Sequence, residues 1–170
     1  HAVMAGGFAI IDTPTQRAAG FTDSPDRAYE DWQEWTEDGD PEWTRYYVEN
    51  SRELIYDWAA ELGADWVRVA VGGYENSVPR FHFSEHGAVD YVLALVRAAL
   101  ELPNVKFLWN QRVEHLTIDS GRVTGVEIIN LRTGEMQTLR GEHMILATGG
   151  FEGDLERVLA NWMPDLPEPD

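Results

Sequence analysis

The sequence predicts an α/β fold class, in an α+β arrangement, from three observations along its 170 residues. Residues 23–102 are mainly helical in pattern, because apolar side chains recur there at intervals of three and four. Residues 105–140 instead contain short alternating segments separated by turns, which is typical of an antiparallel β-meander. Residues 142–162 then have the pattern of a returning strand, a tight turn and a helix.

Three main helices are expected in the first of these regions. Ser24 and Asp40 are candidate N-caps, and each is followed by proline, which is favoured at the first helical position. The second helix is expected to run to about Leu62 and to stop at Gly63, and the third covers about 88–102. The side chains expected in the core are Trp43, Tyr47, Leu54, Ile55, Trp58 and Leu62 on the second helix, and Val89, Val92, Leu93, Val96 and Leu100 on the third.

Strands are expected at 66–71 and throughout the meander. Asp119-Ser120-Gly121 has the composition of a hairpin turn, and residues 132–135 form a second turn. Residues 13–16 and 72–82 are expected to be irregular chain. The strands expected in the meander are residues 105–109, 112–118, 123–130 and 136–139.

The last region contains the least ordinary local sequence. The apolar run from Met144 to Ala147 predicts a buried strand, and it ends at Thr148 and two glycines. Gly149 and Gly150 have no side chains, so the backbone there can approach another group closely. In open α/β sheets, ligands bind beyond the carboxyl ends of the strands, where such turns occur.

Composition excludes several classes of function. The 30 acidic and 13 basic residues give a net charge of −17, which would repel nucleic acid and anionic lipid. No cysteine is present, so disulfides, thiolate metal sites and cysteine nucleophiles are excluded. The five histidines show no zinc-type spacing, and we expect no metal site. No apolar run reaches membrane-spanning length, so we expect no membrane insertion.

The segment Ala147-Thr148-Gly149-Gly150-Phe151 resembles the second flavin-contacting motif of a known enzyme family. That family is the FAD-dependent oxidoreductases related to fumarate reductase and succinate dehydrogenase flavoproteins, which includes the 3-ketosteroid dehydrogenases. The order of elements from His82 to Phe151 follows the family. Ala5-Gly6-Gly7-Phe8 and Asp23-Ser24-Pro25 resemble the stretch that follows the family's first flavin-binding unit.

This resemblance implies part of a Rossmann-like FAD-binding domain, with 23–102 as a mainly helical insertion and 144–147 joining the parallel sheet. It implies a parent enzyme that transfers hydride between flavin and a small organic substrate, such as an enoate or an enone. The residues expected to contact FAD, mainly through backbone atoms, are Ala5, Gly6, Gly7, Val113, Ala147, Thr148, Gly149 and Gly150.

The family's G-x-G-x-x-G fingerprint does not occur in this sequence. We therefore expect these residues to be an internal piece of a larger flavoenzyme, with FAD in the full-length protein and little or none in the isolated piece. The alternative is a non-catalytic α/β fragment or interaction domain that binds no cofactor by itself. An uncovered sheet edge would favour a homo-oligomer, and we expect a cytoplasmic protein.

Tyr74, Arg80 and His82 are the catalytic candidates. They lie in a loop ahead of the third helix, and by resemblance the matching stretch of the family lies near the substrate side of the flavin. In the alternative interpretation, Arg80 and His82 hydrogen-bond to neighbouring carbonyl groups and hold the loop. For any one of these residues we favour the alternative.

Overall fold

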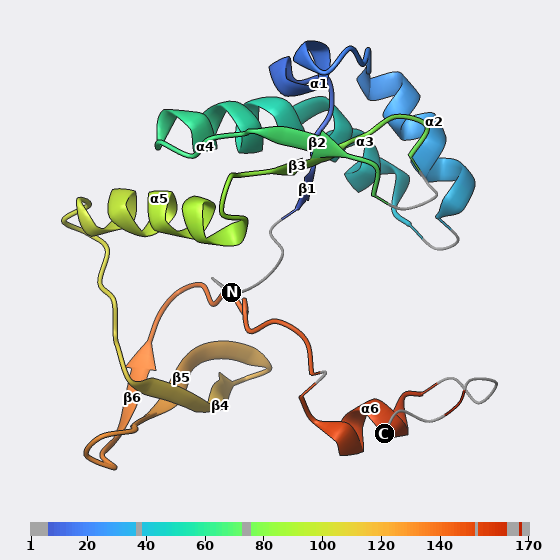
Figure 1. Ribbon diagram of the computed structural model, residues 1–170. Helices are drawn as coiled ribbons and strands as arrows, with labels where there is room; N and C mark the ends of the chain where they lie inside the picture. Colours follow the sequence, from blue (N-terminus) through green and yellow to red (C-terminus); the bar gives the residue numbers. More distant parts are fainter. Residues whose placement is uncertain (1–6, 37–38, 73–75, 152, 163–166, 168–170) are drawn as a thin grey trace. The chain divides into compact units, whose positions relative to one another are not determined.

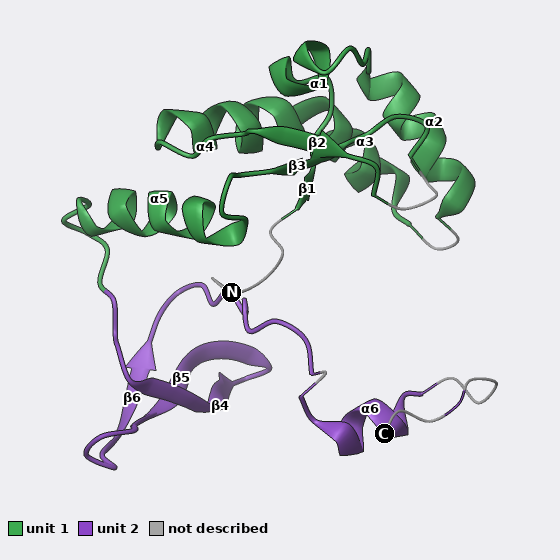
Figure 2. Cartoon of the chain, viewed as in Figure 1, with its two compact units in different colours: residues 1–106 green, residues 107–170 purple. Residues whose placement is uncertain are grey.

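The computed structural model describes residues 7–36, 39–72, 76–151, 153–162 and 167. The chain forms two compact units, residues 1–106 and 107–170, which are coloured separately in Figure 2. Both contain helices with antiparallel sheets, which confirms the α+β arrangement. Within the described residues, no helix is both long and apolar enough to span a bilayer.

The first unit contains the three main helices that the sequence predicts (Figure 1). Helix α2 (Pro25–Trp35) begins where the Ser24 hydroxyl accepts a hydrogen bond from the Arg27 amide. The second is a continuous run of α3 (Pro41–Ser51), the π-helix η1 (Arg52–Asp57) and α4 (Trp58–Glu61). Helix α5 (Ala88–Leu100) is the third, and a short helix α1 (Pro14–Ala18) precedes them all.

Helix α1 corrects the prediction of irregular chain at 13–16. Thr13 accepts a hydrogen bond from the Gln16 amide, and the Gln16 side chain accepts one from the Thr13 amide. This reciprocal capping box satisfies backbone donors that the first helical turn would otherwise leave unpaired. The sequence Thr13-Pro14-Thr15-Gln16 has the pattern of a capping box, so the start of this helix could have been predicted from the sequence.

The core of the first unit is small, and it also corrects a prediction. Its two buried clusters are Ile11, Ala28 and Val48, and Ala59, Ala64 and Ala94. Several side chains that the periodicity assigned to the core are instead substantially exposed: Trp43, Leu54, Trp58, Val89, Leu93 and Leu100. Helical periodicity identifies a face of a helix, but the tertiary contacts decide which face is covered.

A three-stranded antiparallel sheet crosses the first unit in the order β1-β3-β2. The strands are β1 (Phe8–Ala9), β2 (Arg68–Ala70) and β3 (Phe81–Phe83). Strand β3 replaces the loop that the sequence predicted there, because β1 and β2 pair with it on both sides. Both Phe8 and Val69 lie opposite His82, which is therefore at the centre of the sheet.

The second unit is built on the meander of β4 (Gln111–Asp119), β5 (Arg122–Asn130) and β6 (Met136–Arg140). Strands β4 and β5 are joined by Ser120 and Gly121, both with positive φ, as in a type I′ turn. The expected strand at 105–109 does not form. Helix α6 (Leu155–Ala160) follows with its N-cap at Asp154.

The predicted strand at 144–147 is also wrong. These residues have no regular secondary structure, and Ile145 is 91% exposed. A strand is defined by hydrogen bonds to a neighbouring strand, and no described residue supplies that neighbour here. Both sheets of the described chain are antiparallel, so the expected parallel strand is absent from them.

Candidate functional site

Arg80 lies immediately before β3 and is completely buried. Its guanidinium forms a two-point ion pair with Asp23, with Nε–Oδ2 and Nη2–Oδ1 distances of 2.8 Å each. The third nitrogen, Nη1, donates to Asp31 at 2.6 Å and to the Asn76 side chain at 3.1 Å. All three guanidinium nitrogens are therefore bonded to protein groups, and the Asp23 carboxylate is itself fully buried.

The electrostatics keep this cluster ionised. Burial by itself lowers the pKa of Arg80, but its hydrogen bonds and ion pairs with Asp23 and Asp31 raise that pKa above its ordinary value. Burial likewise raises the pKa of Asp31, but hydrogen bonds from Ser77 and Arg80 outweigh it and leave the pKa lowered. A buried charge is tolerated only when paired in this way.

His82 is buried in β3, two residues after Arg80. Its Nδ1 lies 2.6 Å from the Arg80 carbonyl oxygen, and its Nε2 lies 2.6 Å from the Thr13 hydroxyl. A carbonyl oxygen can only accept, so Nδ1 carries the proton and Nε2 accepts from Thr13. Burial lowers the pKa of His82, against the opposing effects of backbone hydrogen bonds and of Asp23, so the neutral ring is favoured. The rings of Tyr56 and Trp66 stand edge-on to it.

These contacts bear on the catalytic candidates. Arg80 and His82 are brought together, but every side-chain nitrogen of both has a protein partner and both side chains are fully buried. The geometry favours the interpretation in which they hold the loop and the sheet, while a catalytic role for either stays a prediction. Tyr74 lies outside the described residues.

Sequence reasoning missed three partners of this cluster: Gln16 and Asp23, which are buried, and Asp31, which is partly exposed. Gln16 donates to Asp23 at 3.0 Å and to the Pro79 carbonyl at 2.9 Å, and it belongs to the capping box of α1. Asp23 and Arg80 are 57 residues apart, and Asp31 and Arg80 are 49 apart. No local sequence pattern indicates such distant ion pairs. Only the capping box of α1 could have been predicted from the sequence.

Of the first group of expected FAD contacts, Ala5 and Gly6 lie outside the described residues. Gly7 is described, and its lack of a side chain has a cause within the first unit. A Cβ there would stand 2.7 Å from Cδ1 of Phe81 and 2.9 Å from Cζ of Phe83. A side chain at this position would force one of these rings to shift, so the first unit itself gives a reason for glycine here.

Val113 lies in β4, at the edge of the described three-stranded sheet. It pairs with Ile128 of β5, and a register shift follows between Val113 and His115. Within the described residues only β5 pairs with β4, so one side of the β4 backbone is open to another group. Its expected main-chain contact with FAD stays a prediction.

Residues 147–150 are exposed and lie outside both sheets. Gly149 has φ of +76°, a left-handed conformation that a side chain would strain. The glycine turn is therefore not buried inside a packed core, and its bare backbone is accessible. An exposed left-handed glycine and an open strand edge both fit a dinucleotide held through the main chain. Gly7 belongs to the first unit, whereas Val113 and the glycine turn belong to the second.

Within the described residues, no group of three His, Asp or Glu side chains is placed to hold a metal ion.

Comparison with known proteins identifies the family. Residues 1–169 match the family model described as "FAD binding domain". The chain is 30% identical, over 187 residues, to a KsdD-like steroid dehydrogenase of Mycolicibacterium smegmatis, covering 92% of this chain and 34% of the relative. It is 32% identical, over 161 residues, to a cytochrome fumarate reductase of Shewanella frigidimarina, covering 92% of this chain and 28% of the relative.

Solved structures show the same fold. The open conformation of a flavocytochrome c3 fumarate reductase matches with a TM-score of 0.80 and 24% identity, over 93% of this chain and 28% of that one. Quinol fumarate reductase from E. coli matches with a TM-score of 0.75 and 21% identity, over 88% and 26%. The chain thus spans about a third or less of the length of these relatives. From the match over residues 1–169, the chain belongs to the FAD binding domain family of flavoproteins.

Proposed function

We propose that this chain is the FAD-holding part of an oxidoreductase that transfers hydride between flavin and a small organic substrate, such as an enoate or an enone. The observation that carries the proposal is the family match over residues 1–169. Relatives named as a steroid dehydrogenase and a fumarate reductase support a redox reaction at a carbon–carbon bond next to an electron-withdrawing group.

The residues proposed to hold FAD act through their backbones. Gly149 and Gly150 offer main-chain groups free of side chains, and Val113 lies in β4, an edge strand of the described sheet. Gly7 joins them in the proposal, with Ala147 and Thr148. Bound FAD would supply the hydride chemistry, and this chain's task is to bind and orient the dinucleotide.

Arg80 and His82 are proposed to stabilise the fold of the first unit and not to take part in catalysis. Their cluster ties β3 to α1 and α2 through Thr13, Asp23 and Asp31. With this role for Arg80 and His82, no residue is assigned as the group that donates or accepts the substrate proton. Cytoplasmic location and self-association through an uncovered sheet edge stay predictions.

The decisive experiment replaces Gly149 with valine in the full-length protein and compares it with a matched control. Gly134 has the same φ of +76°, and it also lies in the second unit, in the turn between β5 and β6. Both replacements impose similar backbone strain, which costs about 1–3 kcal/mol. Only Gly149 is proposed to lie against FAD.

The measurement is the ratio of flavin absorbance in the blue to protein absorbance after purification, with unfolding midpoints recorded alongside. We expect Gly149→Val to lose most of its flavin and Gly134→Val to retain it, at similar stability. Full flavin content in Gly149→Val would overturn the backbone assignment. An unmodified full-length protein that neither retains nor rebinds FAD would instead overturn the proposed function and favour the alternative of an interaction domain that binds no cofactor.

A further inference from the structure

The helical run from α3 to α4 presents large apolar side chains to solvent. Trp43 is 69% exposed, Tyr46 51%, Leu54 50% and Trp58 46%. Single exposed apolar residues are ordinary, but contiguous ones with two tryptophans mark interaction surfaces. We call these four residues the outer face of the run.

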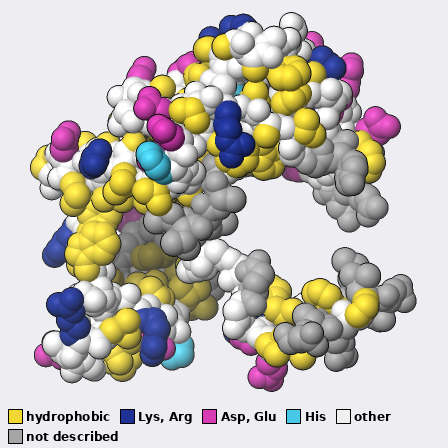
Figure 3. Space-filling model, in the orientation of Figure 1, with side chains coloured by type: hydrophobic (Ala, Val, Ile, Leu, Met, Phe, Trp, Pro, Cys, Tyr) yellow, Lys and Arg dark blue, Asp and Glu magenta, His cyan; other side chains and the backbone are white. Residues whose placement is uncertain are grey.

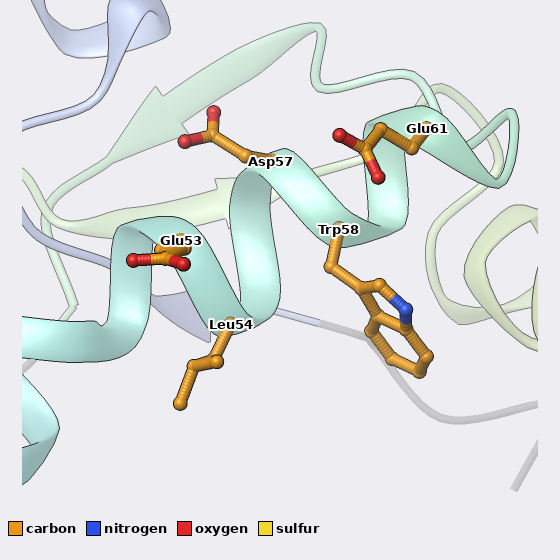
Figure 4. Close-up of a pocket in the computed structure, with 5 residues that line it drawn as sticks. All are labelled: Glu53, Leu54, Asp57, Trp58 and Glu61. Carbon is orange, nitrogen blue, oxygen red and sulfur yellow. The ribbon is translucent and has the colours of Figure 1, made fainter.

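The outer face has two halves, Trp43 with Tyr46 and Leu54 with Trp58, and each half lines its own surface hollow. Exposed positions recur every three or four residues, while the opposite side buries Val48, Ser51 and Ala59. The stripe from Trp43 to Trp58 spans roughly 22 Å at the rise of an α-helix. Figure 4 shows Leu54 and Trp58 pointing to the same side of the helix. Leu54 lies within the π-helix η1 and Trp58 follows it directly, and such turns are frequent at functional sites.

Carboxylates flank the apolar stripe. Glu53, Asp57 and Glu61 follow one another at four-residue intervals, and with Leu54 and Trp58 they line a surface hollow of about 420 Å³. Figure 3 shows acidic side chains among hydrophobic ones over α4. Like charges at this spacing destabilise a helix.

These charges are largely unneutralised within the unit. Asp57 lies 3.7 Å from Arg52, whereas Glu53 and Glu61 have no cation within ion-pair distance among the described residues. Repulsion among these carboxylates therefore destabilises the helix, beside an apolar stripe that is exposed to water. Both are relieved if a surface of opposite charge and matching apolar pattern covers it.

We propose that the outer face docks a basic amphipathic helix of a partner protein. Apolar side chains of that helix would cover Leu54 and Trp58, and its lysines or arginines would lie opposite Glu53, Asp57 and Glu61. Aromatic side chains are the preferred anchors of such interfaces, and complementary charge steers the encounter. This mode is the packing of an amphipathic helix against an apolar surface.

Charge selects this occupant over a second copy of the chain. A second copy that met the first through the same face would bring its own Glu53, Asp57 and Glu61 against these carboxylates. The carboxylates also disfavour an anionic membrane surface. A partner with basic residues around an apolar stripe satisfies both features of the face. The inference does not depend on the proposed flavin chemistry.

The test uses a synthetic 21-residue peptide with leucines on one helical face and lysines flanking them, labelled for fluorescence anisotropy. A matched peptide with glutamate in place of lysine is the control ligand. We expect the lysine peptide to bind and to weaken as salt increases, and the glutamate peptide not to bind. Equal binding of both peptides, or no binding of the lysine peptide at low salt, would overturn the proposal.

Two pairs of substitutions locate the site. Leu54→Ser with Trp58→Ser removes the apolar half, and Glu53→Lys with Glu61→Lys reverses the charge. All four side chains are exposed, so folding should be retained. Each pair should weaken the peptide at least about tenfold, equivalent to about 1.4 kcal/mol. The controls Glu101→Lys and Trp109→Ser, exposed elsewhere, should change nothing. Unchanged binding in either test pair would refute the assignment.

A final measurement asks whether the protein itself covers the face. A cysteine introduced at Leu54, in a sequence that has none, should react rapidly with a maleimide in the free protein. The lysine peptide should protect it. Protection without peptide in a monomer would show that the protein's own chain fills the face. Protection that appears with dimer formation would show a second copy. Either result would contradict the proposed partner.

Discussion

Arg80→Met is predicted to be the most destabilising single change in the buried polar cluster. It removes four charge-assisted hydrogen bonds, three to carboxylates and one to the Asn76 side chain, and leaves the fully buried Asp23 with the Gln16 amide as its described donor. Asp31 suffers less, because it is 17% exposed and retains two hydrogen bonds from Ser77. Breaking a buried ion pair from one side costs about 3–5 kcal/mol. That is a large share of the roughly 5–15 kcal/mol that holds a typical domain together.

The assay is urea unfolding followed by tryptophan fluorescence, with circular dichroism as a second probe. Arg45→Met is the matched control, because Arg45 pairs with Asp26 at 2.8 Å but the Asp26 side chain is 85% exposed. A pair of that kind contributes about 0–1 kcal/mol. The double change Arg80→Met with Asp23→Asn should recover part of the loss, since it removes the uncompensated buried charge.

If Arg80→Met lowers the free energy of unfolding no more than Arg45→Met does, Asp23 is not trapped without a counter-ion, and water or a shift of α2 must reach it. If the double variant is no more stable than Arg80→Met alone, the loss comes from packing and not from charge.

Three further outcomes are expected. Gly125→Ala should destabilise the second unit by about 1–3 kcal/mol. A Cβ there would lie 2.2 Å from the Leu139 carbonyl oxygen and 2.8 Å from Thr117 Oγ1. If this variant unfolds at the wild-type thermal midpoint, the close approach is contradicted. The folded-state pKa of His82 is lowered from its ordinary value of 6.5. The contribution of the neutral ring to stability is therefore present above about pH 6.5 and is lost as the pH falls. Urea unfolding midpoints measured between pH 5 and 8 should decline on the acid side, and His82→Gln should flatten that decline. Ser24→Ala should lower the free energy of unfolding by about 1 kcal/mol because it removes the N-cap of α2, while Ser24→Gly should lower it by only a few tenths of a kcal/mol. Equal losses of stability in the two variants would argue against the cap.

The sequence by itself determined those features whose causes lie within a few residues of one another. Ser24 and Asp40 begin their helices because each side chain accepts hydrogen bonds from amides two or three residues later. Ser120 and Gly121 close the β4–β5 hairpin because both adopt left-handed conformations. The family, too, could be named from the Ala147–Phe151 motif and the order of elements around it.

Only the tertiary structure decided features that depend on distant partners. Residues 81–83 became a strand because β1 and β2 pair with both of its edges, whereas 144–147 did not because no described strand lies beside it. Arg80 was a catalytic candidate in the sequence, and its burial against Asp23 depends on a segment 57 residues away. Trp58 had the spacing of a core residue and lies exposed, since periodicity defines a stripe on a helix but not what packs against it.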